Sequence, residues 1–156
     1  MKKLLLIALL LIPQYALART IASDGSQANI QSIINDAGTI AGDIITIPGA
    51  AGSPQTFHWT GVLDVTKAVT IDGSSLIHNP DTKVCTADDN TIIIDDVNSS
   101  LTHLIRLHTG SRMTGLTIWH GTGTKADGQI QLTGNWTPSL RVDNCHFQLT
   151  LKRRYF

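Results

Sequence analysis

Residues 42–73 read GDIITIPGAAGSPQTFHWTGVLDVTKAVTIDG, and the pattern in this stretch predicts the fold of the whole chain. It contains two short apolar runs, 44–47 and 69–71, and turn-forming residues follow each of them. Side chains alternate along the runs as they do in a strand with one buried face. Ile47 ends the first run and lies 24 positions before its counterpart, Ile71. The stretch therefore predicts two strands separated by a regular interval.

The same interval recurs along the rest of the chain. Five positions, here called the periodic positions, each hold the last apolar residue of a run: Ile47, Ile71, Ile94, Ile118 and Val142. Their spacings are 24, 23, 24 and 24 residues, and further apolar runs lie between them at 57–65, 104–107 and 130–132. A fixed period of this size is typical of stacked coils, in which equivalent strands pair in parallel. We therefore predict an all-β solenoid, a single-stranded parallel β-helix of about 24 residues per coil, with the periodic positions stacked.

The alternative is an antiparallel β-sandwich, because regularly spaced strands occur in that architecture as well. Tight antiparallel hairpins commonly use Asn-Gly or Asp-Gly turns. The chain has Asp-Gly pairs at 24–25, 72–73 and 127–128, and none of them joins two alternating runs. The spacing and the missing hairpin turns together favour the solenoid.

Alternation assigns the residues around the periodic positions to two faces. The inner face would hold the periodic positions and the residues two places before them. The outer face would hold Thr46, Thr70, Ile93, Thr117 and Arg141. The residues that directly follow the periodic positions would form a ladder of Pro48, Asp72, Asp95, Trp119 and Asp143.

One helix is predicted, over residues 27–37. Its apolar stripe has the i, i+3, i+4, i+7 spacing of a helix face and consists of Ile30, Ile33, Ile34 and Ala37. Helix-start residues precede it at 23–26, and Gly38 would end it. We expect this helix to cap the open end of the stack of strands.

The first residues have the pattern of a secretory signal peptide. Residues 1–3 include two lysines, 4–12 are an unbroken apolar run, and 16–18 form an Ala-Leu-Ala exit. We expect cleavage before Arg19 and export to the periplasm, the cell surface or the extracellular medium. The apolar run is too short to span a membrane. The expected organisation is a signal peptide at 1–18, an N-terminal segment with the helix at 19–41, and β-helix coils at 42–156.

The composition fits a β-rich chain that does not bind nucleic acid. All twelve acidic residues are Asp, which favours turns, and there is no Glu, which favours helices. The formal net charge is zero, and Lys2 and Lys3 of the twelve basic residues belong to the leader. Basic residues cluster only at 152–154, so the sequence lacks the extended basic patch of a nucleic-acid-binding protein. Cys85 and Cys145 could form a disulfide after export or remain free thiols.

An ordered set of motifs runs through almost the whole predicted mature chain. It consists of Gly42-Asp43, Ile47-Pro48, Phe57, Trp59-Thr60, Leu63, VTK at 65–67, VTIDG at 69–73, TGLTI at 114–118 and LRVDNCHF at 140–147. Together these motifs resemble those of exported right-handed parallel β-helix proteins of the pectin lyase-like superfamily. The resemblance implies a right-handed coil and a polysaccharide as substrate or ligand.

Acidic residues of the predicted ladder are candidates for metal binding and catalysis. Stacked coils would place Asp72 and Asp95 one coil apart with Asp96 adjacent, and carboxylates so close repel each other or bind a cation. Calcium prefers such oxygen ligands, so these three residues are a candidate calcium site. The resemblance implies two reactions, because pectate lyases combine calcium with a basic residue and glycoside hydrolases of this fold use paired Asp residues. In this chain it implies Asp95 and Asp143 as catalytic acids, with Arg141 as base or carboxylate clamp.

Trp119 and His120 follow a predicted strand and are candidate substrate-binding residues. An exposed indole ring can stack on a sugar ring, and an imidazole can bond to its hydroxyl groups. The alternatives are structural. The aspartates could be turn residues at strand ends, and Trp119 could cover a corner of a coil.

The predicted function is that of an exported polysaccharide lyase, glycoside hydrolase or polysaccharide-binding protein. The alternative is a non-catalytic cell-surface or adhesion module, or an inactive truncated fragment. The chain ends soon after Val142 without a capping segment. An uncapped coil exposes strand edges and apolar core, so we expect an incomplete C-terminal end and self-association through it.

Overall fold

The computed structural model describes residues 17–78, 86–98, 103–123, 128–134 and 140–148. Within these residues the chain forms one helix, three parallel sheets and a hairpin, which we call the arm. Sheet 1 contains, in spatial order, β1 (Thr20–Ala22), β2 (Ile44–Thr46), β5 (Thr70–Asp72), β10 (Arg112–Thr114) and β13 (Arg141–Asp143). Sheet 2 contains β3 (Gln55–Trp59), β8 (Thr91–Asp95), β11 (Thr117–His120) and β14 (His146–Gln148). Sheet 3 contains β4 (Leu63–Val65), β9 (Ile105–His108) and β12 (Ile130–Thr133), and the arm consists of β6 (Leu76–His78) and β7 (Thr86–Asp88).

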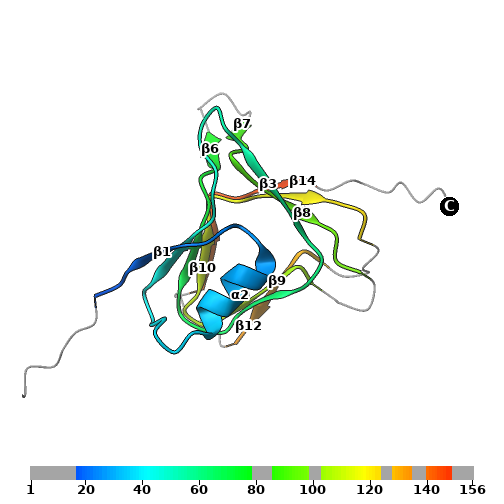
Figure 1. Ribbon diagram of the computed structural model, residues 1–156. Coiled ribbons are helices and arrows are strands. Elements are labelled where there is room, and N and C mark those ends of the chain that lie inside the picture. Colours follow the sequence, from blue (N-terminus) through cyan, green and yellow to red (C-terminus); the bar gives the residue numbers. More distant parts are fainter. Residues whose placement is uncertain (1–16, 79–85, 99–102, 124–127, 135–139, 149–156) are drawn as a thin grey trace, which may run out of the picture.

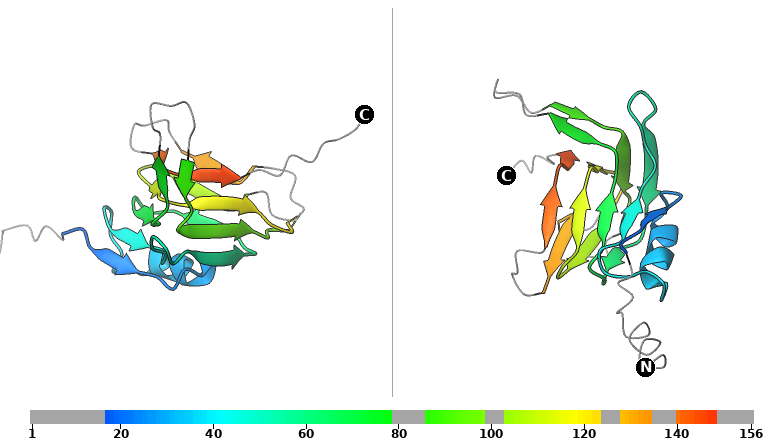
Figure 2. Two further views of the ribbon diagram at one scale, coloured as in Figure 1. Left: turned by 90° about the horizontal axis from the view of Figure 1, so that it is seen from above. Right: turned by 90° about the vertical axis from the view of Figure 1, so that its left-hand side faces the viewer.

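The chain visits the three sheets in a fixed order, and we call each passage through them a circuit. From β2 in sheet 1 it runs to β3 in sheet 2 and β4 in sheet 3, and β5 then returns beside β2. All strand pairings within the three sheets are parallel. The sheets form three sides of a triangle (Figure 1), and successive circuits follow one another along the molecule (Figure 2). The predicted all-β class with parallel pairing is confirmed, and the described sheets do not form an antiparallel sandwich.

The predicted stacking of the periodic positions is wrong. The inner row of sheet 1 consists of Ile21, Ile45, Ile71, Met113 and Val142. Ile94 is absent from this row because it belongs to sheet 2. Ile45 pairs with Ile71, 26 positions later, whereas Ile71 pairs with Met113, 42 positions later. Circuit length therefore varies, and a constant period of 24 residues does not describe the register.

The predicted faces are shifted by one residue in β8 of sheet 2. Ile93, expected on the outer face, is fully buried and pairs with Phe57 and Ile118. Ile94, expected on the inner face, is partly exposed. A slip of one residue exchanges the two faces of a strand. Thr117 does lie on the outer face of sheet 2 as predicted, but the base of the arm covers it, so it is completely buried.

The arm accounts for the longest circuit, and the sequence analysis did not predict it. β6 and β7 pair antiparallel, with Leu76 opposite Asp88. The arm leaves the stack between β5 of sheet 1 and β8 of sheet 2 and projects away from it (Figure 2). At its base, the Ser75 hydroxyl accepts a hydrogen bond from the backbone N–H of Thr91 at 2.9 Å and donates to the carbonyl of Thr91 at 3.1 Å.

The predicted helix is confirmed as α2 (Gln27–Asn35). Ser26 caps its N-terminus, because its hydroxyl accepts a hydrogen bond from the backbone N–H of Asn29 at 3.2 Å. Ile30 and Ile34 are fully buried, and the helix lies across the end of the triangle (Figure 1). It therefore caps the first circuit as expected. Within the described part of the chain, no helical segment has the length and apolarity that crossing a bilayer requires.

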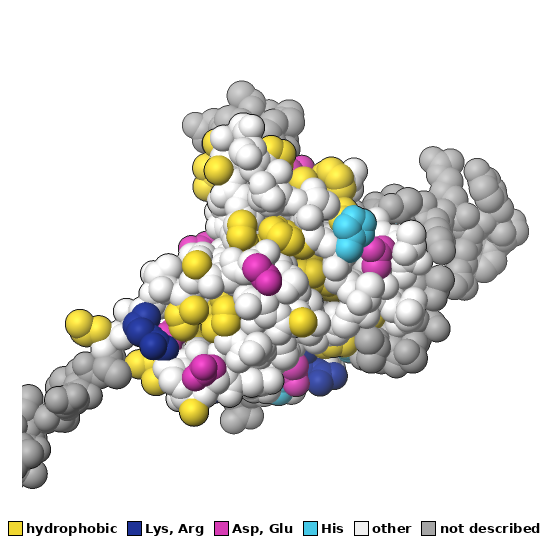
Figure 3. Space-filling model, viewed as in Figure 1, with side chains coloured by type: hydrophobic (Ala, Val, Ile, Leu, Met, Phe, Trp, Pro, Cys, Tyr) yellow, Lys and Arg dark blue, Asp and Glu magenta, His cyan; other side chains and the backbone are white. Residues whose placement is uncertain are grey.

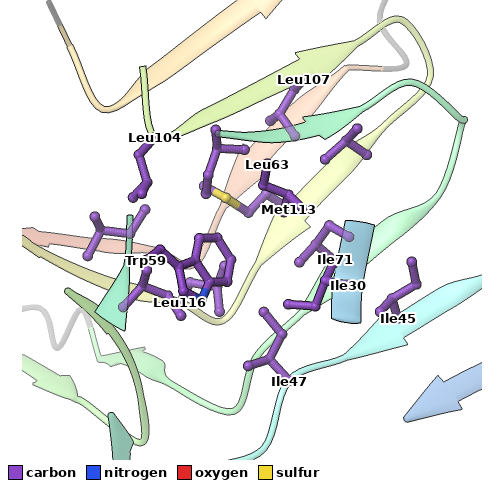
Figure 4. Close-up of a cluster of buried hydrophobic side chains, with 14 of the residues drawn as sticks. Ile30, Ile45, Ile47, Trp59, Leu63, Ile71, Leu104, Leu107, Met113 and Leu116 are labelled. Atoms are coloured by element: carbon purple, nitrogen blue, oxygen red, sulfur yellow. The ribbon is translucent and has the colours of Figure 1, made fainter. Parts of the chain in front are cut away.

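The core fills the space that the three sheets and α2 enclose. Ile71 and Met113 from sheet 1, and Leu63 and Leu107 from sheet 3, point into the same cluster (Figure 4). Burial of each such side chain contributes about 1.5–3 kcal/mol to folding. Trp59 is also buried, and its indole N–H donates a 3.0 Å hydrogen bond to the carbonyl of Gly25.

Two predictions concern residues outside the described ranges. Residues 1–16 of the signal peptide are among them, and so is Cys85, so export and the disulfide stay predictions. Cys145 is described, and its thiol donates to the carbonyl of Asp143 at 3.1 Å. Burial raises the pKa of the Cys145 thiol.

Candidate functional site

The outer face of sheet 2 carries a groove of about 480 Å³. On neighbouring strands of this sheet, Trp119 pairs with Gln148 and Thr117 pairs with His146. Alternate residues of a strand point to the same face, so these four side chains form a two-by-two patch. The groove lies over this patch and is lined by Trp119, His120, His146, Gln148 and Asp89, the last from the base of the arm.

Asp89 connects the polar side chains at the edge of the groove. Its Oδ1 atom accepts a hydrogen bond from Thr117 Oγ1 at 2.7 Å and lies 2.8 Å from Nδ1 of His146. Thr117 Oγ1 also lies 3.1 Å from the hydroxyl of Ser75, at the other end of the arm. Both ends of the arm are thus anchored on sheet 2, and the carboxylate is held beside the imidazole.

The carboxylate determines which nitrogen of His146 carries a proton. A carboxylate can only accept a hydrogen bond, so Nδ1 is the donor and Nε2 of the neutral ring remains an acceptor. Trp119 carries a hydrogen-bond donor, its indole N–H. This N–H is buried, and no acceptor among the described residues reaches it. An unbonded buried donor costs on the order of 1–3 kcal/mol.

A second polar patch lies on the outer face of sheet 1. Arg112 and Arg141 pair on adjacent strands, and both bind the carboxylate of Asp143. The distances are 3.0 Å from Arg112 Nη2 to Oδ1 and 2.5 Å from Arg141 Nη2 to Oδ2. Burial alone raises the pKa of Asp143, but the hydrogen bonds from Arg112 and Thr114 and the two guanidinium charges hold it below its usual value. Asp143 is therefore ionised at neutral pH, and Arg141 serves as its partner.

Asp72 belongs to the same row of sheet 1, with Thr114 between it and Asp143. Two strand spacings separate the two acids, which is about 9.6 Å. Burial raises the pKa of Asp72; the charge of Arg112 opposes this shift and the charge of Asp143 adds to it. A groove of about 360 Å³ lies beside Asp72 and is lined by Ala22, Ser23, Thr46, Ile47, Pro48, Gly49, Gly73 and Ser74.

The structure does not bring the predicted catalytic residues together. Asp143 and Arg141 are in contact on sheet 1, as described above. Asp95 lies in sheet 2, paired with Trp59 and His120, and is only 2% exposed. The expectation that Asp95 and Asp143 share one site came from the stacking of the periodic positions and fails with it.

The predicted calcium ligands are separated as well. Asp72 lies on sheet 1, whereas Asp95 and Asp96 lie at the end of β8 in sheet 2. Asp96 is already engaged, with Nδ1 of His58 at 2.6 Å and the backbone N–H of Thr122 at 2.7 Å. The hydrogen bond from His58 is the main reason that the pKa of Asp96 is lowered. Among the described residues, no three His, Cys or Asp side chains are arranged to hold a metal ion, and calcium binding stays a prediction.

The sequence analysis placed Trp119 and His120 in a binding site, and both line the groove on sheet 2. It missed Asp89, which lies in the unpredicted arm. His146 also reaches the groove, because its pairing with Thr117 places it on the outer face of sheet 2. Arg112 was missed because the assumed period placed no strand there.

Arg106 is part of a surface network on sheet 3. Nε of Arg106 donates to Oε1 of Gln131 at 2.7 Å, and Nη1 lies 3.6 Å from Asp64 Oδ2. Asp64 also lies 2.8 Å from Nε2 of His108. These contacts join three circuits along one outer row, which indicates a structural role.

No protein-family model, curated protein or solved structure matches this chain.

Proposed function

We propose that the chain is an exported, right-handed parallel β-helix protein of the pectin lyase-like type that binds polysaccharide through the groove on sheet 2. The observation that carries this proposal is an indole ring set among imidazole, amide and carboxylate side chains in one groove. The fixed order in which the chain visits the three sheets supports the coiled architecture.

The groove combines the two kinds of contact that a sugar requires. Trp119 offers an apolar ring that can cover the C–H face of a pyranose, while His146 and Gln148 offer polar atoms at its edge. The site is built on paired strands, so its side chains are held in fixed relative positions. A polysaccharide chain can extend beyond the groove because the outer face of a sheet is open.

Affinity electrophoresis or calorimetry with a panel of soluble polysaccharides tests this proposal. We expect Trp119→Ala to weaken binding about tenfold or more, because an aromatic anchor of an interface commonly contributes 2 kcal/mol or more. Thr70→Ala is the control, since Thr70 is a partly exposed residue on sheet 1, away from the groove. Absence of binding to every polysaccharide by the unmodified protein would refute the proposal.

A second candidate function is glycoside hydrolysis at sheet 1, which the row Asp72, Thr114, Asp143 favours. Inverting hydrolases separate their two carboxyl groups by about 6.5–9.5 Å, close to two strand spacings. A raised carboxyl pKa suits a general acid, and a lowered one suits a general base. The pKa of Asp72 is raised and that of Asp143 is lowered, so Asp72 would be the acid and Asp143 the base. The two guanidinium groups on Asp143 weaken it as a base, so we rank this function below binding.

Product analysis separates the two functions. A hydrolase releases reducing ends, and a lyase increases ultraviolet absorbance by forming an unsaturated product. Under the hydrolase hypothesis, Asp72→Asn and Asp143→Asn abolish release while Trp119→Ala retains some of it. If polysaccharides bind but neither signal develops, with or without added calcium, the protein is a binding module.

Self-association is a further part of the proposal. Strands β12, β13 and β14 are the last strands of their sheets among the described residues. Phe147 and Leu132 on two of these strands are 38% and 48% exposed. Unpaired edges with exposed apolar side chains favour pairing with another chain. Size-exclusion chromatography should show a mass that rises with concentration, and a concentration-independent monomer would contradict this.

A further inference from the structure

We infer that the groove on sheet 2 selects uncharged polysaccharides and rejects uronate-bearing ones. This inference rests on the proposed function and adds the substrate class. It depends on two observations about the described residues: the charges around the groove, and the hydrogen-bonding state in which Asp89 holds His146.

The charges around the groove are acidic. Asp89 lines it, and a second acidic residue, Asp88, precedes Asp89 in the chain. The described Lys and Arg residues lie instead in the N-terminal segment, on sheets 1 and 3, and after β4: Arg19, Lys67, Arg106, Arg112 and Arg141. On the face that Figure 3 shows, Lys and Arg side chains are few and far apart.

Recognition of a sugar carboxylate normally uses an Arg or Lys that pairs with it. No Arg or Lys is among the described residues that line this groove, and Asp89 would face the incoming anion with a like charge. Like charges that meet in an interface oppose binding. A uronate would therefore lose affinity relative to the same sugar without its charge.

The hydrogen-bonding groups of the groove fit hydroxyl groups better than carboxylates. Because Asp89 accepts from Nδ1 of His146, Nε2 of the neutral ring presents a lone pair. A sugar hydroxyl can donate to that lone pair, whereas a carboxylate cannot. Gln148 offers both a donor and an acceptor. A hydroxyl group both donates and accepts, so it satisfies this set of atoms.

Homogalacturonan provides a matched pair of probes, because the fully methyl-esterified and the de-esterified polymers share one backbone and differ in charge. We would measure their affinities for the full chain at pH 7.5 in calcium-free buffer, with a neutral β-glucan and a neutral galactan as further probes. We expect the esterified polymer to bind about tenfold or more tightly than the acidic one, which corresponds to about 1.4 kcal/mol. Equal binding, or preference for the acidic polymer, would overturn the inference.

Asp89→Asn tests the origin of the selectivity. The amide oxygen of Asn can still accept from Nδ1 of His146, so the variant removes the charge and keeps an acceptor. We expect the ratio of the two affinities to fall about threefold or more, because the like charge that opposes the acidic polymer is removed. Asp88→Asn is the control, because it makes the same charge change one residue outside the groove lining and should alter the ratio less.

The outcomes separate this inference from the proposed function. If none of the probes binds, the proposed function fails. If neutral polymers bind no better than acidic ones, only the inference fails. If Asp89→Asn and Asp88→Asn change the ratio equally, the role of Asp89 is refuted. Far-ultraviolet circular dichroism and thermal unfolding would establish that each variant is folded.

Discussion

The backbone nitrogen of Arg19 lies 2.8 Å from Oδ1 of Asp43, whose side chain is completely buried. The same carboxylate accepts a hydrogen bond from the backbone N–H of Ile40 at 3.0 Å and one from Arg19 Nη2 at 3.1 Å. Gly42, with φ of 92°, makes the turn that leads into Asp43. The Gly42-Asp43 motif thus has a structural role, since it ties the N-terminal segment to the start of sheet 1.

Processing before Arg19 should strengthen this contact. Cleavage would convert the N–H of Arg19 into an ammonium group beside the carboxylate. A protein that begins at Arg19 should therefore unfold at a higher temperature at pH 7 than one that retains Ala18. Asp43→Asn should remove most of this difference. N-terminal sequencing of the exported protein would establish the cleavage site, and equal unfolding temperatures would contradict the prediction.

The contribution of Asp43 should also depend on pH in a defined direction. Hydrogen bonds from Ile40 and Arg19 lower its pKa in the folded protein. A lowered folded pKa means that the stabilisation is present above the ordinary value of 3.8 and is lost as the pH falls through the folded value. The unfolding free energies of the unmodified protein and of Asp43→Asn should be measured from pH 7 to pH 2. The two values should become equal only at the acid end of this range.

Two adjacent isoleucines in β8 test the register. Ile93→Ala should cost about 2–5 kcal/mol of unfolding free energy, because Ile93 is fully buried. Ile94→Ala should cost at most about 1 kcal/mol, because its side chain lies on the partly exposed outer face. Both variants lose the same atoms in the same strand, so the difference isolates burial. Urea denaturation measures the unfolding free energy of each variant. A larger loss for Ile94→Ala than for Ile93→Ala would support the register that the sequence pattern suggested.

Thr117→Val should loosen the arm. The substitution keeps the shape of the side chain but removes the hydroxyl that donates to Asp89 at 2.7 Å. Loss of this hydrogen bond should cost about 0.5–1.5 kcal/mol, because Asp89 is partly exposed and keeps its contact with His146. Thr70→Val, on the partly exposed outer face of sheet 1, makes the same change and should be close to neutral. If β7 exchanges its amide hydrogens faster in Thr117→Val but not in Thr70→Val, Thr117 holds the arm in place. Unchanged exchange in Thr117→Val would count against this role.

Asp72 and Asp143 should respond to amide substitution with opposite signs. Burial raises the pKa of Asp72, so its ionised form destabilises the fold, and this penalty grows as the pH rises from 3.8 through the raised value. Asp72→Asn should therefore raise the unfolding temperature at pH 7 and have little effect at pH 3. Asp143 has a lowered pKa and supports two arginines, so Asp143→Asn should lower the unfolding temperature at pH 7. Thermal scans at both pH values test the pair, and shifts of the same sign at pH 7 would contradict it.

The class of fold and its elements were predictable because they depend on local patterns. Apolar runs such as 44–47 and 69–71 coincide with β2 and with β5, and the stripe that includes Ile30 and Ile34 forms the capping helix. Parallel pairing was predictable from the repeated spacing of those runs. These signals act within a single strand or helix, so they do not depend on how the circuits are aligned.

Register was not predictable from spacing, because neighbouring circuits differ in length. Ile92, Ile93 and Ile94 offer apolar side chains to both faces of β8, so alternation could not decide which residue faces the core. The site was affected in the same way. His146 and Asp89 are far apart in sequence, and only the arm brings the carboxylate to the groove.

The arm also bears on how such a protein could change its ligand. It enters between β5 and β8, yet β5 still pairs in parallel with β10, and β8 with both β3 and β11. A corner that accepts so many additional residues without disturbing the ladders on either side can accept other segments too. Replacing the arm by loops of different sequence would exchange the groove's acidic wall while the scaffold persists. The segments inserted at the corners could then change what the protein binds, while the paired strands keep the architecture unchanged.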